Sequence, residues 1–202
     1  MTPPLVLAAL HAPVTVLGRG RRLGLWVQGC RQRCPDCLAP GLQPETGGQI
    51  WPLAALTTHA AGLVRGQRLD GVTISGGEPL LQWAALRDFV RELVRLRPGL
   101  DVLVYTGYVL RKGRFVTADA PAGDPGFVIP TDWFDVLVDG PWQEKEADSE
   151  ALRGSKNQRI LPFTKRGRRL AASLICPRPG AAGRQYFRTP DGIFIAGIPA
   201  GG

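Results

Sequence analysis

Apolar positions along the chain follow two spacings, one typical of buried strands and one typical of amphipathic helices. Short apolar and β-branched runs predict strands at 23–28, 71–75, 101–107 and 134–140. Residues 80–99 have apolar side chains three and four positions apart, with a Pro-Gly end, which predicts a helix. Residues 52–66 predict another helix. Strand–helix–strand units of this length are typical of a mainly parallel α/β sheet covered by helices.

The last part of the chain has a different pattern. Residues 183–199 hold two β-forming runs around a Pro-Asp-Gly turn, which predicts a β-hairpin. "TKRGRR" at 164–169 predicts a solvated loop, and 117–126 predicts a flexible one. Because no repeat or linker divides the 202 residues, we expect a single domain over 1–202. Its core would cover about 14–161 and its C-terminal extension 162–202.

Composition is ordinary for a soluble globular protein, with 44% hydrophobic and 21% charged residues. No apolar run approaches the ~20 residues of a membrane span. The start of the chain has no basic residue before its apolar patch, which argues against a signal peptide. A secreted chain of this size would more often have paired, dispersed cysteines, so the cysteine usage favours a reducing cytoplasm. The net charge of +8 comes from scattered basic residues with few interleaved aromatics. This pattern makes nucleic acid an improbable ligand and suits an acidic protein partner.

Four unusual segments follow the ends of predicted strands. One is a cysteine-containing loop after Gln28, and the others are "GGEP" at 76–79, "YTGY" at 105–108 and "VDGP" at 138–141. In parallel α/β sheets ligands bind beyond the carboxyl ends of the strands. We therefore expect all four segments to meet on one face of the protein.

Three of the four cysteines, Cys30, Cys34 and Cys37, follow a C-x3-C-x2-C spacing. A structural zinc site wants a fourth ligand, and neither histidine is near in the sequence. A redox C-x-x-C pair would leave Cys30 without a role, and inert buried cysteines do not suit so polar a loop. An iron–sulfur cluster held by three thiolates, with one iron open to another ligand, is the remaining interpretation. Spacing alone leaves these alternatives open.

The neighbouring motifs carry a family resemblance. The cysteine loop after one strand and "SGGEP" after the next resemble the radical S-adenosylmethionine (SAM) enzymes. Within them the chain resembles the small activating proteins of anaerobic ribonucleotide reductase, through "GLWVQGC", "GVTISGGEPLLQ", "VLVYTGY", "DVLVDGPW" and "RGSKNQRI". The resemblance covers about 14–161 and leaves out the C-terminal hairpin. It implies a partial (β/α) barrel with mainly parallel strands.

The resemblance implies a [4Fe–4S] cluster on Cys30, Cys34 and Cys37, whose open iron binds the amino and carboxylate groups of SAM. One electron then breaks the sulfonium C–S bond and leaves methionine and a 5′-deoxyadenosyl radical. The radical would abstract a glycine Cα hydrogen in a large glycyl radical enzyme, such as anaerobic ribonucleoside-triphosphate reductase. Flavodoxin or ferredoxin would supply the electron, and no membrane takes part. The alternatives are modification of another peptide or small molecule, and a non-catalytic iron–sulfur or zinc protein.

The resemblance also implies residues that contact SAM. Gly76 and Gly77, without Cβ atoms, would let the backbone approach the ligand, and Glu78 would face its ammonium. Asp36 and Leu38, on either side of the third cysteine, would contact adenine. In the family an aromatic residue or Gly is usual just before the third cysteine and an aromatic just after it. Neither is present here, so we expect this contact to run mainly through the backbone.

Other polar residues near the expected site have ordinary interpretations beside functional ones. Thr73 or Ser75 could turn a hydroxyl toward the ligand, since they alternate along one strand. Asp139 is predicted to cap a turn rather than to bind ribose. Residues 153–159, "RGSKNQR", are a docking loop or a solvated loop. No function is predicted for His11, His59 and Cys176.

Overall fold

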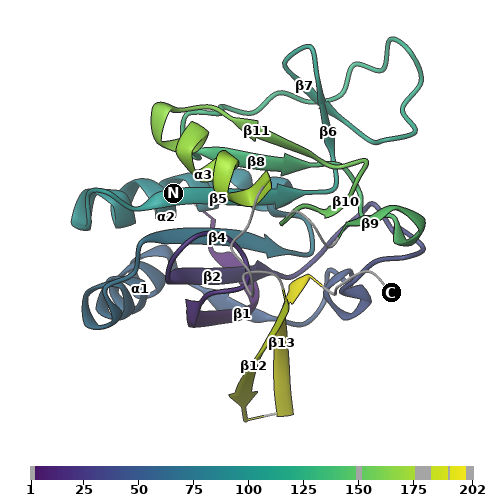
Figure 1. The fold of residues 1–202 in the computed structure, drawn as a ribbon. Helices are drawn as coiled ribbons and strands as arrows, with labels where there is room; N and C mark the ends of the chain where they lie inside the picture. The colour runs from purple at the N-terminus through teal and green to yellow at the C-terminus, as the bar shows by residue number, and fades with distance from the viewer. Residues whose placement is uncertain (1–2, 149–151, 176–182, 191, 199–202) are drawn as a thin grey trace.

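A computed structural model describes residues 3–148, 152–175, 183–190 and 192–198, and its centre is a seven-stranded sheet (Figure 1). The sheet order is β11-β8-β5-β4-β2-β1-β3. The four central strands run parallel, as predicted: β2 (Arg22–Val27), β4 (Gly71–Gly76), β5 (Asp101–Thr106) and β8 (Val136–Asp139). The flanking strands are antiparallel: β1 (Leu5–Val14), β3 (Gln49–Trp51) and β11 (Arg159–Pro162).

The observed architecture is mixed α/β with a mainly parallel centre and a C-terminal hairpin, which confirms the fold class in outline. The expected partial barrel of the radical SAM type is not confirmed. Among the described residues the sheet is open and ends in antiparallel strands on both sides, so no closed barrel forms.

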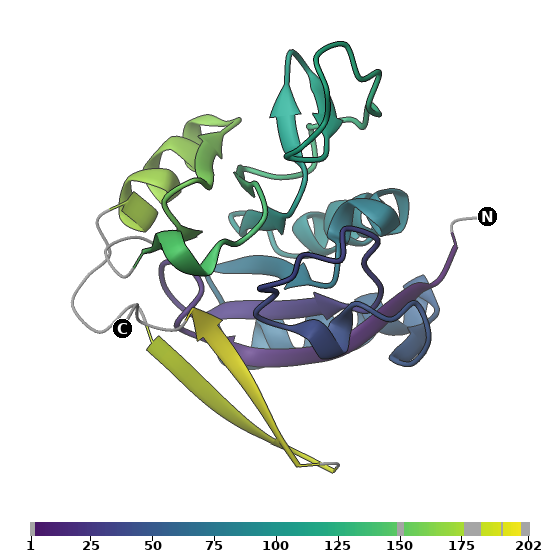
Figure 2. The same ribbon diagram turned by 90° about the vertical axis from the view of Figure 1, so that its right-hand side faces the viewer.

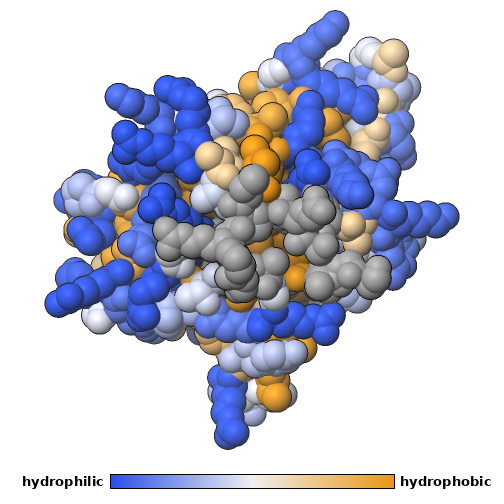
Figure 3. Space-filling view, viewed as in Figure 1, coloured by the Kyte–Doolittle hydropathy of each residue, from blue (hydrophilic) through white to orange (hydrophobic). Residues whose placement is uncertain are grey.

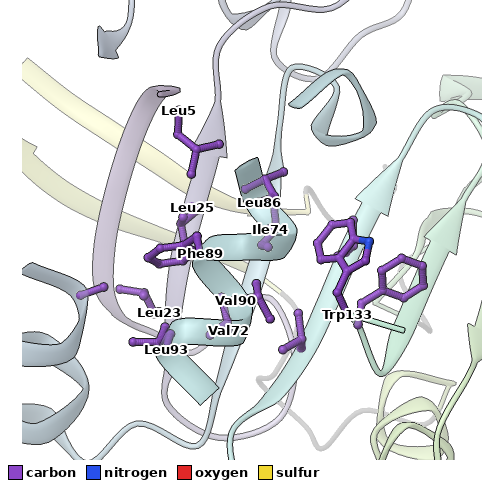
Figure 4. Packing of buried hydrophobic residues seen from close by; sticks show 14 of the residues in the cluster. Leu5, Leu23, Leu25, Val72, Ile74, Leu86, Phe89, Val90, Leu93 and Trp133 are labelled. Carbon is purple, nitrogen blue, oxygen red and sulfur yellow. The ribbon is translucent and has the colours of Figure 1, made fainter. Parts of the chain in front are cut away.

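Two helices cover one face of the sheet, α1 (Leu53–Gln67) and α2 (Trp83–Leu96) (Figure 2). Figure 4 shows Phe89 and Leu93 of α2 packed toward Leu23 of β2 and Val72 of β4, all fully buried. The predicted helix at 80–99 begins later than expected. A 3-10 turn, η2 (Pro79–Gln82), precedes it.

The opposite face is covered by α3 (Lys165–Ile175) and by the hairpin of β12 (Gly183–Thr189) and β13 (Gly192–Ile198). The hairpin was predicted. The predicted loop at 164–169 is wrong, because α3 begins at Lys165. Leu170, Ala171 and Leu174 bury one side of this helix against the sheet, while most charged side chains of the first turn stay exposed.

The remaining elements are short and lie near the carboxyl ends of the parallel strands. A projecting hairpin pairs β6 (Val109–Arg111) with β7 (Arg114–Val116), and 117–126, the predicted flexible loop, contains turns without helix or strand. No helix in the described part of the chain is long and apolar enough to cross a membrane. The other short elements are η1 (Pro40–Leu42), η3 (Glu144–Glu146), β9 (Ala147–Asp148) and β10 (Gly154–Ser155).

Candidate active site

Figure 2 is viewed from the side on which the carboxyl ends of the parallel strands lie. A cavity of about 420 Å³ is lined by residues at and beyond these strand ends. It is lined from all four segments that follow predicted strand ends, namely the cysteine loop and residues 75–78, 105–107 and 140–142. The prediction that these segments meet on one face is therefore confirmed. A volume of this size is sufficient for a small-molecule ligand.

The cysteine loop is closed at its base by backbone hydrogen bonds. Gly29 N donates to Leu42 O at 2.9 Å, and Cys30 N donates to Gln43 O at 2.8 Å. The segment between these pairs carries all three cysteines of the motif, and each of them lines the cavity. The fold thus holds the ends of the loop to the sheet and presents its thiols to one hollow.

The three thiols are free and only partly exposed. Burial raises the pKa of Cys30 and of Cys34, and negative charge on the neighbouring thiols and on Glu78 raises both further. Thiolates at Cys30 and Cys34 are therefore unfavourable here without a compensating cation. Because metal ligation requires deprotonated thiols, an iron-containing group would supply that positive charge.

Three thiols line the same cavity. Within the described ranges, no three His, Cys, Asp or Glu side chains are placed to hold one metal ion. A closed structural zinc site uses four ligands, whereas in an iron–sulfur cluster each thiolate binds a different iron.

The two glycines of "GGEP" pack closely against the end of β2 and the base of the cysteine loop. Gly77 N donates to Val27 O, and Glu78 N donates to Gly29 O, both at 2.8 Å. A Cβ atom on Gly77 would clash with the Gly29 carbonyl and lie 2.8 Å from Leu42 O. Both glycines line the cavity, and the missing side chain of Gly77 permits its close contact with the backbone at the base of the cysteine loop.

Glu78 is 1% exposed, and its carboxylate accepts four hydrogen bonds. The donors are Leu80 N and Thr106 Oγ1 at 2.8 Å, Gly107 N at 2.9 Å and Gln32 Nε2 at 3.2 Å. Burial raises the pKa of Glu78 to about 7, although these hydrogen bonds act in the opposite direction. Gln32 is the longest of the four contacts and the one that comes from the cysteine loop.

The other residues predicted to contact a ligand are placed unequally. Leu38 lines the cavity and is 44% exposed, whereas Asp36 is exposed and does not line it. Ser75 also faces the cavity. Thr73 does not, because its buried hydroxyl accepts from Arg22 Nε at 2.6 Å and donates to Leu17 O.

Asp139 has a structural role in this arrangement. Its buried carboxylate accepts from Leu110 N at 2.8 Å and from Arg159 Nε at 3.0 Å, with a further bond from Arg159 Nη2. These contacts join the end of β8 to β6 and β11. They agree with the predicted turn role and leave no carboxylate oxygen unpaired for ribose.

The segment 153–159 supports the turn that follows β8. Asn157 Nδ2 donates to Pro141 O, and Gln158 Nε2 donates to Gly140 O, each at 2.7 Å. Neither alternative predicted for "RGSKNQR" describes these two side chains, which fix a turn inside the protein. The turn places Trp142 at the cavity, and the "DGPW" motif was the signal for this residue.

Sequence reasoning did not identify several further residues of the cavity wall. Gln32 lies inside the cysteine motif, but nothing in the spacing indicates its bond to Glu78. Phe194, Ile195 and Ile198 of β13 also line the cavity, although the hairpin lies outside every recognised motif. His11 packs against this hairpin and His59 lies beside Trp51, while Cys176 lies outside the described residues.

Comparisons with known proteins agree with this arrangement. Residues 16–161 match the model of a family described as a 4Fe-4S single cluster domain. An anaerobic ribonucleoside-triphosphate reductase-activating protein of Pasteurella multocida is 30% identical over 159 residues, covering 74% of this chain and 92% of the relative. Its namesake from Haemophilus influenzae is 30% identical, covering 76% and 96%, and that from Escherichia coli K12 is 29% identical, covering 73% and 93%.

The family match begins before β2 and ends at residue 161. It therefore contains the cysteine loop, the "GGEP" turn and the "DGPW" turn, and excludes α3 and the C-terminal hairpin. On this evidence the chain belongs to the family of 4Fe-4S single cluster domains that includes the anaerobic ribonucleoside-triphosphate reductase-activating proteins.

Proposed function

We propose that this protein is a radical SAM activating enzyme, which reductively cleaves SAM and generates a glycyl radical on a partner such as anaerobic ribonucleoside-triphosphate reductase. One observation carries the proposal. Three free thiols and the "GGEP" turn face one cavity in a chain whose relatives bear the name of activating proteins. We further propose that the protein works in the reducing cytoplasm.

Cys30, Cys34 and Cys37 would hold the [4Fe–4S] cluster. When bound, the cluster supplies the electron that cleaves SAM, and its fourth iron gives SAM an open coordination position. The protein's part is to fix the loop ends and to keep water away from the reacting group. Trp26, Trp142 and Phe194 line the cavity with apolar surface suited to excluding water.

Glu78 would bind the ammonium of SAM, as the resemblance implies. All four donors to its carboxylate are present without a ligand, so an ammonium must replace one of them. Gln32 is the donor most easily replaced, because its contact is the longest and its side chain faces the cavity. Leu80, Thr106 and Gly107 would keep the carboxylate in place during this exchange.

The experiment is anaerobic reconstitution, followed by reduction in the presence of SAM and an assay for 5′-deoxyadenosine. Single Ala substitutions of Cys30, Cys34 or Cys37 should abolish the product, while Cys176→Ala should retain it as a matched control. Zinc in place of iron after anaerobic expression, or cluster loss in Cys176→Ala, would contradict the proposal.

A second measurement separates the proposed function from its rival. Mixed with the anaerobic reductase of the same organism, SAM and reductant, the protein should produce a glycine-centred doublet in electron paramagnetic resonance. SAM cleavage without this doublet, against every glycyl radical enzyme of that organism, would favour modification of another peptide or small molecule.

A further inference from the structure

The C-terminal hairpin is fixed to the sheet by its inner face. Phe187 stacks on His11 of β1 with ring centroids 4.3 Å apart, and Phe194 meets the edge of Trp26 of β2 at 4.8 Å. Gln185 adds hydrogen bonds to the backbone at the end of β1, accepting from Thr15 N and donating to Pro13 O. These contacts give the hairpin a defined position relative to the parallel strands.

The same hairpin forms part of the cavity wall. Phe194, Ile195 and Ile198 line the cavity together with Trp26 and the cysteines. Because the family match ends at residue 161, the hairpin adds to the shared core a wall that the matched region does not contain. The hairpin is therefore where the cavity of this chain can differ from that of its relatives in the ligands it accepts.

The outer face of the hairpin is apolar and basic. Its side chains alternate with the inner ones along both strands, and three large apolar members are strongly exposed: Tyr186 at 62%, Ile193 at 66% and Ile195 at 51%. The strand register sets Tyr186 opposite Ile195 and Arg188 opposite Ile193. In Figure 3 hydrophobic and hydrophilic residues lie side by side on the projection below the main body. We call Arg184, Tyr186, Arg188, Ile193 and Ile195 the outer face.

Folding does not explain this composition, because the inner face already anchors the hairpin. Exposed aliphatic side chains together with Tyr and Arg are typical of protein interfaces. The outer face carries two arginines, and the described hairpin residues include no acidic side chain. Its charge and apolar area are complementary to an extended segment that carries both acidic and apolar side chains.

The outer face is continuous with the cavity, and this continuity indicates which partner would bind to it. Ile195 belongs both to the outer face and to the cavity lining, so a chain lying on this face is led toward the thiols. An electron donor does not need this path, since it has only to approach the cluster. A polypeptide whose glycine enters the cavity must pass the mouth of the cavity.

We propose that the outer face binds an acidic and apolar segment of the polypeptide substrate, next to the glycine that enters the cavity. This inference rests on the proposed function. It assigns to the hairpin the selection of the partner, and leaves SAM cleavage to the loops of the core.

The test uses the reconstituted full-length protein and the anaerobic ribonucleoside-triphosphate reductase of the same organism. The double variant Arg188→Glu/Ile193→Ser should raise the Kd for the reductase at least roughly tenfold, as expected when an interface loses central contacts. Arg65→Glu, an exposed charge reversal on α1, is the matched control and should stay within about twofold. Reductant-driven SAM cleavage without the partner should be equal in all three proteins.

The outcomes separate the two proposals. Absence of SAM cleavage in the unmodified protein defeats the proposed function whatever the binding data show. Normal SAM cleavage with reductase binding absent, or equal in the double variant and wild type, overturns the docking inference. A sedimentation coefficient that differs between the double variant and the unmodified protein would assign the outer face to contact with a second copy of the chain. Weaker flavodoxin binding by the double variant would assign the outer face to the electron donor. Either result also overturns the inference. Single variants Arg188→Glu and Ile193→Ser, each checked by its thermal unfolding midpoint, guard against a folding defect in the double variant.

Discussion

Glu78 has a structural role at the site where we propose that it also binds a ligand. Its carboxylate joins the "GGEP" turn to the end of β5 and to the cysteine loop through hydrogen bonds. Full burial would normally favour the neutral acid, and the four donors resist that tendency. The resulting pKa of about 7 leaves the group close to balance between its two charge states.

From this balance we predict that SAM affinity falls as the pH is lowered. The pKa of Glu78 is raised, so below about 7 its carboxyl takes up a proton and loses its attraction for an ammonium. Binding should weaken between about pH 7.5 and about pH 6, and Glu78→Gln should bind roughly tenfold more weakly at the upper value. Equilibrium dialysis of labelled SAM under anaerobic conditions measures both quantities.

Glu78→Gln should also lose the pH dependence, since it has no carboxyl to titrate. Glu92→Gln, an exposed change on α2, provides the control and should keep both the affinity and its slope with pH. A slope that survives in Glu78→Gln would show that another group controls the affinity.

At the scale of elements, the cysteine loop and the "GGEP" turn form one unit. The backbone bonds of Gly77 and Glu78 end on Val27 and Gly29, directly before the first cysteine of the motif. The position of the thiols therefore depends on a turn that follows the neighbouring parallel strand. A change in the turn should reach the cluster as well as the ligand.

We predict that Gly77→Val reduces iron content together with SAM binding. The added side chain meets the Gly29 and Leu42 carbonyls, which are backbone atoms and cannot move aside without shifting the loop. Iron per chain after anaerobic reconstitution and the intensity of the cluster absorbance are the measurements. Gly62→Val on α1, where an added Cβ has no neighbour within 4 Å, should load normally. Full loading in Gly77→Val would mean that the turn and the loop move independently.

Arg22 joins three parallel strands from inside the sheet. Its fully buried guanidinium in β2 donates to Thr73 Oγ1 and Val72 O of β4, and pairs with Asp101 of β5 at 2.6 Å. Breaking one side of a buried ion pair leaves the partner without compensation. Arg22 is therefore a stability residue at the opposite end of the strands from the thiols.

Arg22→Ala should lower the free energy of unfolding by about 3–5 kcal/mol. Arg95→Ala removes a solvent-exposed pair with Glu92 and should cost no more than about 1 kcal/mol. Denaturant unfolding of the metal-free proteins, followed by circular dichroism, gives the comparison. Equal losses in the two variants would show that the buried network adds nothing beyond a surface pair.

The elements differ in how well the sequence predicts them. The central strands and α2 were predictable because their apolar spacing directly reflects burial. The loop prediction for residues 164–169 was wrong because this stretch alone is mostly charged. The helical spacing of α3 becomes visible only when Leu170 and Leu174 are considered with it. The partners of Glu78 come from three separate segments, and spacing along the chain holds no information about such distant contacts.

At the scale of the whole molecule, the protein carries a net charge of +8, while the walls of its cavity are largely apolar. Such a charge steers acidic proteins over distances comparable to the Debye length, while the fit of the final complex depends on local contacts. Arg33, exposed between Cys30 and Cys34, brings part of this charge to the loop itself, while the charge of Arg31 is paired with Glu45.

The rate of cluster reduction by reduced flavodoxin should therefore fall as the salt concentration rises. Screening shortens the reach of the positive charge, and we expect a roughly tenfold decrease between about 50 mM and about 500 mM salt. Stopped-flow absorbance follows the cluster. Photoreduced deazaflavin, a small reductant without the charge of a protein, should show a much weaker dependence. Equal salt dependence for the two reductants would remove electrostatic steering from the mechanism.

The chain order of the hairpin has a consequence for biosynthesis. The ribosome makes the cysteine loop long before β12 and β13, and domains begin to fold from their N-terminal part. Until the hairpin stacks on His11 and Trp26, the cavity lacks the wall formed by Phe194, Ile195 and Ile198. The cavity that holds the thiols would thus be wider in the unfinished chain than in the finished protein.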